Sequence, residues 1–287
     1  MPINILRNNL VFKRIISRLD IKNNTLVKGI SLEGLRVLGD PRYFALEYYN
    51  DGIDEIHFQD VVASLYNRNT LDEIISATVK NVFVTINAGG GIRNIKDINR
   101  VLRLGADKIT INSAAVRNPE LIKIASETYG VSTIAVAVET LKVNDKDLVL
   151  IESGREKTNL ELFSWIEKIQ KLGAGEIILT SIDHEGKKNG FNVPLYKAIK
   201  KNSDIPIIAH GGAGNIQDIV EVFSIADVDA VSIASILHYS YMKDLQTNEE
   251  QGNKIFMKNY KSNNMNYDIK NIKQELLKNN INIRKNV

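Results

Sequence analysis

The sequence contains no cysteine among its 287 residues. This absence excludes disulfide bonds, thiolate nucleophiles and zinc sites built on cysteine. Histidine is scarce as well, and the four histidines lack the spacing of a metal-ligand pair: His57, His184, His210 and His238. We therefore expect a protein with no bound metal ion and no cofactor.

A long apolar run and a strong excess of one charge are also missing. No segment approaches the roughly 20 apolar residues that a membrane-spanning helix needs, and residues 1–10 include Arg7, Asn8 and Asn9 where a secretion signal would be apolar. The net charge of +3 is too small to indicate nucleic-acid binding, and its basic surplus lies mostly in a solvated tail beyond residue 253. We expect a cytoplasmic protein that binds neither membranes nor nucleic acids.

What the sequence does contain is a regular alternation of short β-branched runs and longer amphipathic stretches. Strands are predicted at residues 14–19, 55–58, 82–86, 108–111, 133–138, 176–179, 206–209 and 230–233. Helices are predicted at residues 41–49, 71–79, 95–104, 119–129, 160–172, 193–201, 216–224 and 269–277. Alternating strands and helices require a parallel sheet, and eight such units favour a closed (β/α)8 TIM barrel over an open sheet.

The chain also repeats itself. Residues 88–98 match residues 209–219 at an offset of 121, and residues 52–56 match residues 173–177 at the same offset. Residues 107–113 match residues 229–235 after a slip of one position. A nearly constant offset favours two half-barrels, at about residues 12–131 and 132–240, within one domain that spans residues 1–287.

Three segments fall outside this repeat. Residues 1–12 precede the first predicted strand, and residues 142–154 have the alternation of a β-hairpin after the fifth strand. Residues 239–267 are polar and rich in asparagine, which is typical of an inserted surface loop. A C-terminal helix is expected at about residues 269–280.

Two glycine runs, at residues 89–91 and 211–214, each follow a predicted strand and lead into a helix. Backbone amides can approach an anion there, and the helix N-terminus adds partial positive charge. One such run alone is more often a simple tight turn, but two at symmetric positions indicate a ligand with two phosphates. The first site would comprise Gly90, Gly91, Asn112 and Ser113, and the second Gly212, Gly214 and Ser235.

Two carboxylates end opposite strands of the predicted barrel. Asp20 follows the first strand and Glu139 the fifth, so the two should face each other across the carboxyl-terminal mouth, where such barrels place their active sites. That arrangement suits general acid–base catalysis on an extended substrate. Two solvated loop-capping acids are the alternative interpretation.

These residues resemble the family of the cyclase subunit of imidazole glycerol phosphate synthase, an enzyme of histidine biosynthesis. The resemblance covers about residues 12–239 and 268–284. Its motifs are Lys13-Arg14-Ile15-Ile16 with Leu19-Asp20, Val27-Lys28-Gly29, Gly39-Asp40-Pro41, Gly89-Gly90-Gly91-Ile92, Gly105-Ala106-Asp107-Lys108, Gly175-Glu176-Ile177 with Leu179-Thr180-Ser181-Ile182-Asp183, and Gly211-Gly212-Ala213-Gly214.

The resemblance implies a lyase that takes phosphoribulosyl-formimino aminoimidazole carboxamide ribotide and ammonia. The products would be imidazole glycerol phosphate and aminoimidazole carboxamide ribotide. Asp20 and Glu139 take the places of the two catalytic aspartates, Lys28 that of a lysine in a loop that closes over substrate, and Thr180 lies in a matching substrate-binding segment.

The resemblance further implies that ammonia comes from a glutaminase subunit, docked as a heterodimer at the N-terminal face of the barrel. Four charged residues match the ring that gates the ammonia route: Arg14, Glu55, Lys108 and Glu176. Charges pointing inward at strand starts are costly unless they are paired. Two acids and two bases therefore predict a paired ring.

Several positions depart from the family pattern: Glu139 and Glu185 stand in place of aspartates, Arg18 and His210 in place of small residues, and Leu32 in place of an aromatic. The insertion at residues 239–267 is also unusual. A second hypothesis is therefore a paralogue that passes ammonia to another amidation pathway, such as that of a surface sugar, with little or no cyclase activity. A third is a half-barrel sugar isomerase, against which the four gate-like charges argue, because it needs no ammonia.

Overall fold

The computed structural model describes residues 11–63, 71–242 and 267–285. The predicted N-terminal extension and most of the polar insertion lie outside these residues.

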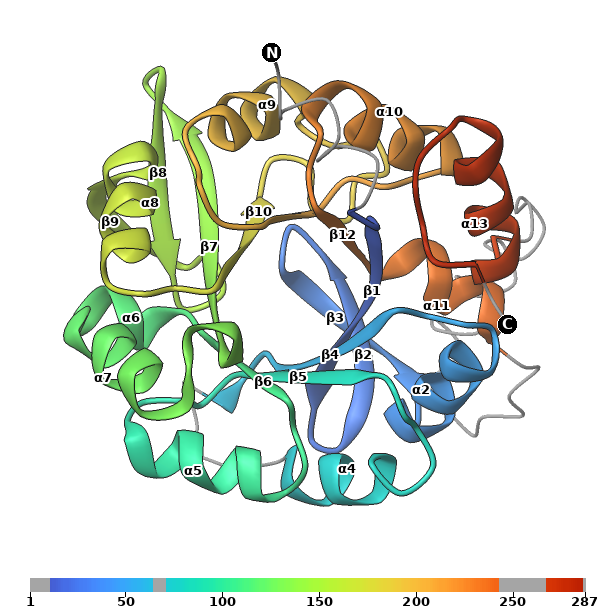
Figure 1. Cartoon of the computed structure of the whole chain (residues 1–287), viewed down its shortest axis with the longest axis horizontal. Coiled ribbons are helices and arrows are strands. Elements are labelled where there is room, and N and C mark those ends of the chain that lie inside the picture. The colour runs from blue at the N-terminus through green and yellow to red at the C-terminus, as the bar shows by residue number, and fades with distance from the viewer. Residues whose placement is uncertain (1–10, 64–70, 243–266, 286–287) are drawn as a thin grey trace, which may run out of the picture.

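Eight parallel strands close into a barrel (Figure 1). They are β1 (Arg14–Lys22), β4 (Glu55–Asp60), β5 (Thr85–Gly89), β6 (Lys108–Ile111), β7 (Ile134–Val143), β10 (Glu176–Ser181), β11 (Ile207–His210) and β12 (Ala230–Ile233). Pairing of β12 with β1 and of β7 with β10 completes the ring. The predicted barrel fold is thus confirmed.

Helices surround the barrel and cover its outer side (Figure 1). They are α2 (Pro41–Asn50), α4 (Leu71–Thr78), α5 (Ile95–Arg103), α6 (Ser113–Arg117), α7 (Glu120–Tyr129), α8 (Leu162–Lys171), α9 (Val193–Lys201), α10 (Ile216–Ala226), α11 (Ser235–Tyr241) and α13 (Ile269–Lys278), with a 3₁₀ turn η1 at Val131–Thr133. Every predicted helix is present. The short helices α6 and α11, which begin at the serines of the two predicted phosphate sites, were not predicted.

One predicted strand start is wrong by three residues. The prediction began the third strand at Val82, but β5 begins at Thr85. The reason is local, because the amides of Asn81 and Val82 both bond to the carbonyl of Thr78 and thereby extend the turn that ends α4.

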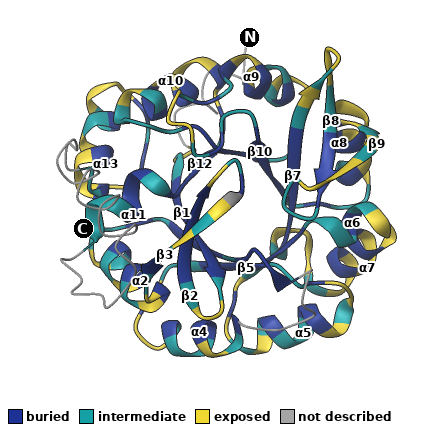
Figure 2. Ribbon diagram, turned by 180° about the vertical axis from the view of Figure 1, so that it is seen from behind, coloured by how far each residue is buried: buried dark blue, intermediate teal, exposed yellow. Residues whose placement is uncertain are grey.

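Because successive side chains of a strand point to opposite faces, the barrel has one apolar core outside the strands and another inside them. Residues such as Ile15 and Leu19 of β1 point outward and belong to the large cluster that packs the barrel against the helices. A small apolar layer fills the inside of the barrel, formed by Ile16, Ala135, Ile178, Ile208 and Ala230. Figure 2 shows the barrel strands almost wholly buried, as two-sided packing requires.

The sequence repeat recurs as repeated contacts. The carboxylate of Asp107 accepts from the amide of Ile86, and that of Asp229 accepts from the amide of Ile207, each at 2.8 Å. Asn94 caps α5 and Asn215 caps α10 in the same way, with their side chains on the amides of the first turn. The two halves are therefore built alike where their sequences match.

Two hairpins extend from the barrel strands. The first, β2 (Thr25–Ile30) and β3 (Glu33–Gly39), was not predicted; β2 continues antiparallel to the end of β1, where Asp20 pairs with Val27. The second was predicted, and it has an additional strand: β7 pairs with β8 (Lys146–Ile151), which pairs with β9 (Glu156–Glu161). The hairpins meet at one small cluster over the barrel, which contains Leu32, Leu150 and Ile182.

Two glycines, one after strand β5 and one after helix α7, offer a test of this backbone. Gly90 has φ +91°, and a Cβ there would lie 2.2 Å from the carbonyl oxygen of Asp60. Gly130 has a nearly equal φ of +89° but nothing within 4 Å. We expect Gly90→Ala to lower the free energy of unfolding by about 2 kcal/mol or more, and Gly130→Ala by about 1 kcal/mol. Urea denaturation measures both, and equal losses would contradict the close approach at Gly90.

Candidate active site

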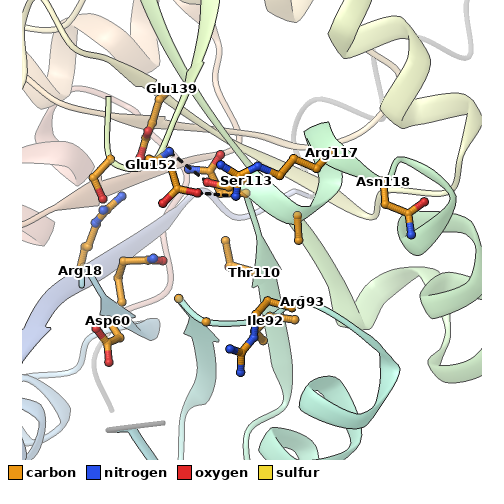
Figure 3. Close-up of a pocket in the computed structure, with 16 residues that line it drawn as sticks. Arg18, Asp60, Ile92, Arg93, Thr110, Ser113, Arg117, Asn118, Glu139 and Glu152 are labelled. Atoms are coloured by element: carbon orange, nitrogen blue, oxygen red, sulfur yellow. Dashed lines mark hydrogen bonds and ion pairs between the residues drawn. The ribbon is translucent and has the colours of Figure 1, made fainter. Parts of the chain in front are cut away.

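A cavity of about 240 Å³ opens at the carboxyl ends of β5 and β6 (Figure 3). All four residues predicted for the first phosphate site line it: Gly90, Gly91, Asn112 and Ser113. Glu139 and Arg18 line the same cavity. The sequence analysis thus identified residues that the fold gathers in one place.

Two cations at this cavity were missed. Arg93 lies two residues after the glycine run, beyond Ile92, and its guanidinium pairs with Asp97 at 3.2 Å. Arg117 lies at the end of α6 and pairs with Glu152 at 2.6 Å and with Glu156 at 3.1 Å (Figure 3). Both side chains are more than a third exposed, so they can turn toward an anion. A basic residue in the turn between the glycine run and the following helix is the signal that could have identified Arg93.

The second predicted phosphate site is much tighter. A cavity of about 20 Å³ is lined by Gly212 and Ser235, together with Lys28, Glu185 and His210. That volume holds about one water molecule. The amide of Gly214 is already bonded to the carboxylate of Asp218 at 2.8 Å, so it is not free to bind an anion. Gly214 and Ser235 line a separate, still smaller cavity of about 10 Å³, so Ser235 lies beside both predicted glycines.

His210 fits here because the residue beside it on the neighbouring strand is smaller than its counterpart in the first half of the barrel. Gly89 occupies the corresponding place in the first half, and a Cβ on it would lie 2.3 Å from Oε1 of Gln59. In the second half, Gln59 corresponds to Thr180, which pairs with His210 in register. The smaller threonine leaves room for the imidazole. Thr180 also pairs with Glu139, so it lies beside the catalytic candidate.

Asp20 and Glu139 are both buried, and the Arg18 guanidinium interacts electrostatically with both. Arg18 Nε donates to Asp20 Oδ1 at 2.8 Å, and Lys28 Nζ is 3.9 Å from Asp20 Oδ2. Glu139 Oε2 accepts from the amide of Gly154 in the second hairpin at 2.9 Å. The hairpin thus positions one of the two carboxylates, a role that the sequence did not indicate.

The environments of the two acids displace their pKa values in opposite directions. Burial would raise the pKa of Asp20, but the cations Arg18 and Lys28 outweigh it and lower that pKa to about 2. Burial dominates at Glu139 and raises its pKa, despite the opposing effect of Arg18. One carboxyl is therefore held as the anion while the other is shifted toward the protonated acid, which is the division of roles that acid–base catalysis needs.

Lys28 is held in place by Glu185. The two side chains form a buried ion pair, and the second oxygen of Glu185 accepts from the amide of Leu32 at 2.9 Å. Ser31 donates its amide to the carbonyl of Glu185 at 3.0 Å. The tip of the first hairpin is therefore fastened across the barrel mouth, next to the second glycine run.

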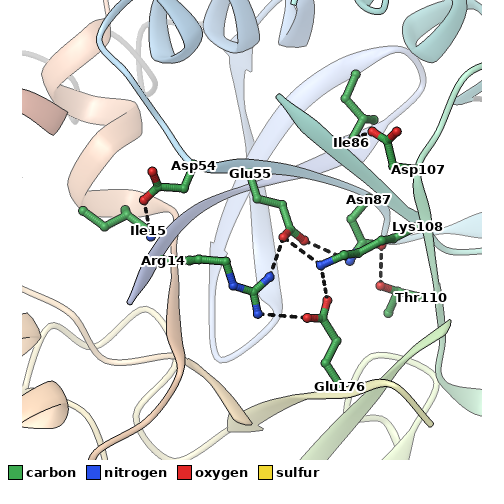
Figure 4. Close-up of polar contacts among 10 residues, drawn as sticks. All are labelled: Arg14, Ile15, Asp54, Glu55, Ile86, Asn87, Asp107, Lys108, Thr110 and Glu176. Carbon is green, nitrogen blue, oxygen red and sulfur yellow. Dashed lines mark hydrogen bonds and ion pairs between the residues drawn. The ribbon is translucent and has the colours of Figure 1, made fainter. Parts of the chain in front are cut away.

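At the opposite end of the barrel, the four predicted gate residues form one closed ring (Figure 4). Arg14 bonds to Glu55 at 2.8 Å and to Glu176 at 2.9 Å, while Lys108 bonds to Glu55 at 3.0 Å and to Glu176 at 2.9 Å. Burial and the nearby Glu176 raise the pKa of Glu55, and the cations Lys108 and Arg14 oppose that rise. The ring fills the barrel axis directly below the apolar layer.

Removing one cation from the ring should be costly. We expect Lys108→Met to lower the free energy of unfolding by about 3 kcal/mol, because it leaves a buried carboxylate short of a partner. A carboxyl with a raised folded-state pKa loses stability as pH rises through that pKa, so the deficit should shrink in acid. Urea denaturation at several pH values measures this, with Lys108→Met/Glu55→Gln as the charge-matched control. A deficit that is independent of pH would contradict the assigned role of Glu55.

No helix in residues 11–63, 71–242 and 267–285 is long and apolar enough to cross a membrane. Over the same residues, no three side chains of histidine, aspartate or glutamate gather as metal ligands would.

Comparison with known proteins identifies the family. A family model described as "Histidine biosynthesis protein" matches residues 14–243. The chain is 43% identical to a protein of Natranaerobius thermophilus over 79% of its own length and 90% of the relative. A protein of Legionella pneumophila is 46% identical over 71% of this chain and 97% of the relative, and one of Bacillus cereus strain G9842 is 45% identical over 79% and 90%. All three are named "Imidazole glycerol phosphate synthase subunit HisF". The chain belongs to this family, the HisF subunits of imidazole glycerol phosphate synthase.

Proposed function

We propose that this chain is a working cyclase subunit, which converts the phosphoribulosyl-formimino ribotide and ammonia into imidazole glycerol phosphate and aminoimidazole carboxamide ribotide. The observation that carries the proposal is the pair Asp20 and Glu139, buried at one barrel mouth with pKa values displaced in opposite directions. The closed charged ring at the other mouth supports an ammonia route along the same axis.

Each carboxyl has a role that follows from its protonation state. Ammonia that adds to a carbonyl of the substrate gains a positive charge on nitrogen while the oxygen gains negative charge. Asp20, held as the anion, accepts a proton from the nitrogen, and Glu139, held toward the acid form, gives a proton to the oxygen. The product of these two transfers is a carbinolamine. The proton that Asp20 took then goes to its hydroxyl, water leaves, and Glu139 takes back a proton from the resulting iminium nitrogen. When this nitrogen closes the ring onto the formimino carbon, the bond from that carbon to the aminoimidazole nitrogen breaks, and aminoimidazole carboxamide ribotide leaves as the amine.

The two phosphates would bind at opposite sides of this pair. The cavity at Gly90, Gly91 and Ser113 has room for one, with Arg93 and Arg117 close enough to turn toward it. The second would enter between Gly212 and Ser235, where it must displace the Lys28 side chain from Glu185 and push His210 aside. We therefore expect substrate binding to reorganise the second site more than the first.

These roles predict a sharp contrast among substitutions. Asp20→Asn and Glu139→Gln should each lower glutamine-driven cyclisation by roughly 10²–10⁴-fold, whereas Glu139→Asp should stay within about tenfold. Turnover should also fall as pH rises through the pKa of Glu139, which lies above the ordinary value, because the acid form is lost. A cyclase assay over a pH series tests this, with urea denaturation to confirm that each variant folds. Full activity of Asp20→Asn would place the chemistry elsewhere.

The glutaminase partner should bind the N-terminal face. Large apolar side chains are exposed beside the starts of the strands there, with exposed fractions of 57% for Phe12, 74% for Phe83 and 50% for Val131. Such residues are typical of an interface core. Their position around the charged ring would place the source of ammonia directly beneath the barrel axis.

Substituting the most exposed of these residues tests the docking face. Phe83→Glu should weaken the complex with the glutaminase by tenfold or more and uncouple glutamine hydrolysis, while cyclisation with ammonium salt continues. Phe163→Glu is the matched control, since Phe163 is 43% exposed at the start of α8, on the other side of the barrel. Isothermal titration calorimetry measures the affinities, and equal effects of the two substitutions would contradict docking at the N-terminal face.

One observation favours a second candidate, an ammonia conduit for another amidation reaction. Arg18 is 4% exposed and bonds to Asp20, so it occupies space between the two carboxylates that a cyclase substrate would need. If this candidate is correct, the wild type will not turn over the ribotide with ammonium salt. Asp20→Asn will then leave the partner's ammonia-dependent reaction unchanged.

A further inference from the structure

Arg18 is a buried cation whose hydrogen-bonding capacity is mostly unused. A guanidinium carries five N–H donors. Among the described residues only Nε of Arg18 has an acceptor, which is Asp20 Oδ1 at 2.8 Å. The residue is 4% exposed, so bulk water has little access to Nη1 and Nη2. Buried donors are seldom left unpaired, and these two nitrogens therefore indicate an acceptor that a ligand supplies.

The side chain of Arg18 reaches a cavity that already has a candidate anchor for a ligand. Ile16, two residues earlier on β1, belongs to the apolar layer inside the barrel, so Arg18 also points inward. It lines the cavity of about 240 Å³ that contains the first phosphate site. Figure 3 shows Arg18 across this cavity from Arg93. A ligand whose phosphate binds at the glycine run would therefore extend toward Arg18.

The charges around Arg18 restrict the chemistry of the missing acceptor. Asp20 compensates Arg18, and a second buried pair, Lys28 with Glu185, is complete as well. These four charges sum to zero. A ligand carboxylate would add an uncompensated negative charge close to Asp20 and Glu139. A carbonyl oxygen adds no net charge and accepts N–H bonds, so it fits this environment better.

We propose that Arg18 is a further catalytic residue, which binds the carbonyl oxygen of a phosphorylated ketose group through its Nη nitrogens and stabilises the negative charge that this oxygen gains when ammonia adds. A carbonyl bound in this way lies in the cavity and leaves the bond from Nε to Asp20 intact. The inference rests on the proposed function, because this carbonyl is the one to which the proposed cyclase adds ammonia.

The part of Arg18 in the reaction is electrostatic. As the C–N bond forms, the electron pair of the C=O π bond moves onto the oxygen, which Glu139 then protonates. Arg18 gives up no proton itself: burial would lower its pKa, but the charge of Asp20 and the hydrogen bond to it outweigh burial and raise that pKa. Fixed donors aimed at an oxygen that gains charge lower the barrel's barrier for the addition, as in an oxyanion hole.

Binding of the carbonyl can be measured without turnover. Ribulose 5-phosphate carries a phosphate and a ketone, and ribitol 5-phosphate is the matched ligand with a hydroxyl in place of the ketone. Isothermal titration calorimetry should show roughly tenfold tighter binding of the ketose to the wild type. With ¹³C at the ketone carbon, infrared difference spectra should show the C=O band at lower wavenumber in the complex, because the guanidinium polarises the bond. Equal affinities for the two ligands, or an unmoved band, would overturn the proposal.

Substitution then tests the catalytic step. Arg18→Met keeps most of the length and removes every donor, and it should lower kcat for cyclisation with ammonium salt by roughly 10²–10³-fold. KM for the ribotide should rise less than kcat falls, because the interaction strengthens as charge develops on the oxygen. Arg18→Gln retains N–H donors without the charge and should fall between Arg18→Met and the wild type. Urea denaturation verifies folding, and the wild-type binding measurements decide the matter if Arg18→Met does not fold.

A pH series distinguishes this role from a merely supporting one. Arg18 lowers the pKa of Asp20, so Arg18→Met should raise it. If Arg18 served only to keep Asp20 ionised, turnover of the variant relative to the wild type would recover at high pH, where Asp20 ionises again. A ratio that stays low at every pH is the expected result, and recovery at high pH would overturn the proposal.

The same measurements separate this inference from the proposed function. A wild type that moves the carbonyl band but never cyclises the ribotide would contradict the cyclase function and leave the carbonyl site supported. A wild type that cyclises the ribotide, together with full turnover by Arg18→Met, would contradict the role of Arg18 alone.

Discussion

The four-membered ring of Arg14, Glu55, Lys108 and Glu176 is the interaction on which the barrel interior depends. It joins four strands across the axis, and every charge in it has two opposite neighbours, so no charge is buried alone. The ring therefore closes the base of the barrel with paired charges, next to the apolar layer of the interior.

At the carboxyl-terminal mouth of the barrel, the buried cation Arg18 likewise compensates acidic side chains. It compensates Asp20 at 2.8 Å and acts on Glu139 through space, so a single buried cation helps to set the charge of both acids. Burial and, after it, the same cation lower the pKa of His57 and of His210 to about 3, so both rings are neutral near pH 7. The mouth of the barrel is thus one coupled electrostatic unit, and altering Arg18 would change every group in it.

The sequence was sufficient for the barrel and its repeat, because each leaves a periodic or symmetric pattern, and the resemblance to the family supplied the ring. The offset that pairs Asp107 with Asp229 in the sequence also pairs their hydrogen bonds in space. The first hairpin left no such pattern, since it is formed by pairing with the overhanging end of β1 beyond the barrel. Nor could the sequence indicate that the second glycine run is tighter than the first, because that depends on Thr180 making room for His210 in a neighbouring strand.

The long acid at position 139 is best understood together with the hairpin beside it. Glu139 Oε2 reaches the amide of Gly154, whose φ of +76° is the left-handed conformation that glycine adopts readily. A Cβ at Gly154 would lie within 3.1 Å of Ile182 and 3.3 Å of Leu32, so the hairpin packs too closely there for any other residue to fit without adjustment. Packing against Leu32 and Ile182 therefore fixes the turn at Gly154. The amide of this turn positions the carboxyl of Glu139, whose side chain is one methylene longer than that of an aspartate. Packing above the mouth thus determines where the carboxyl oxygen of Glu139 lies, and the fold accommodates the added length of this side chain.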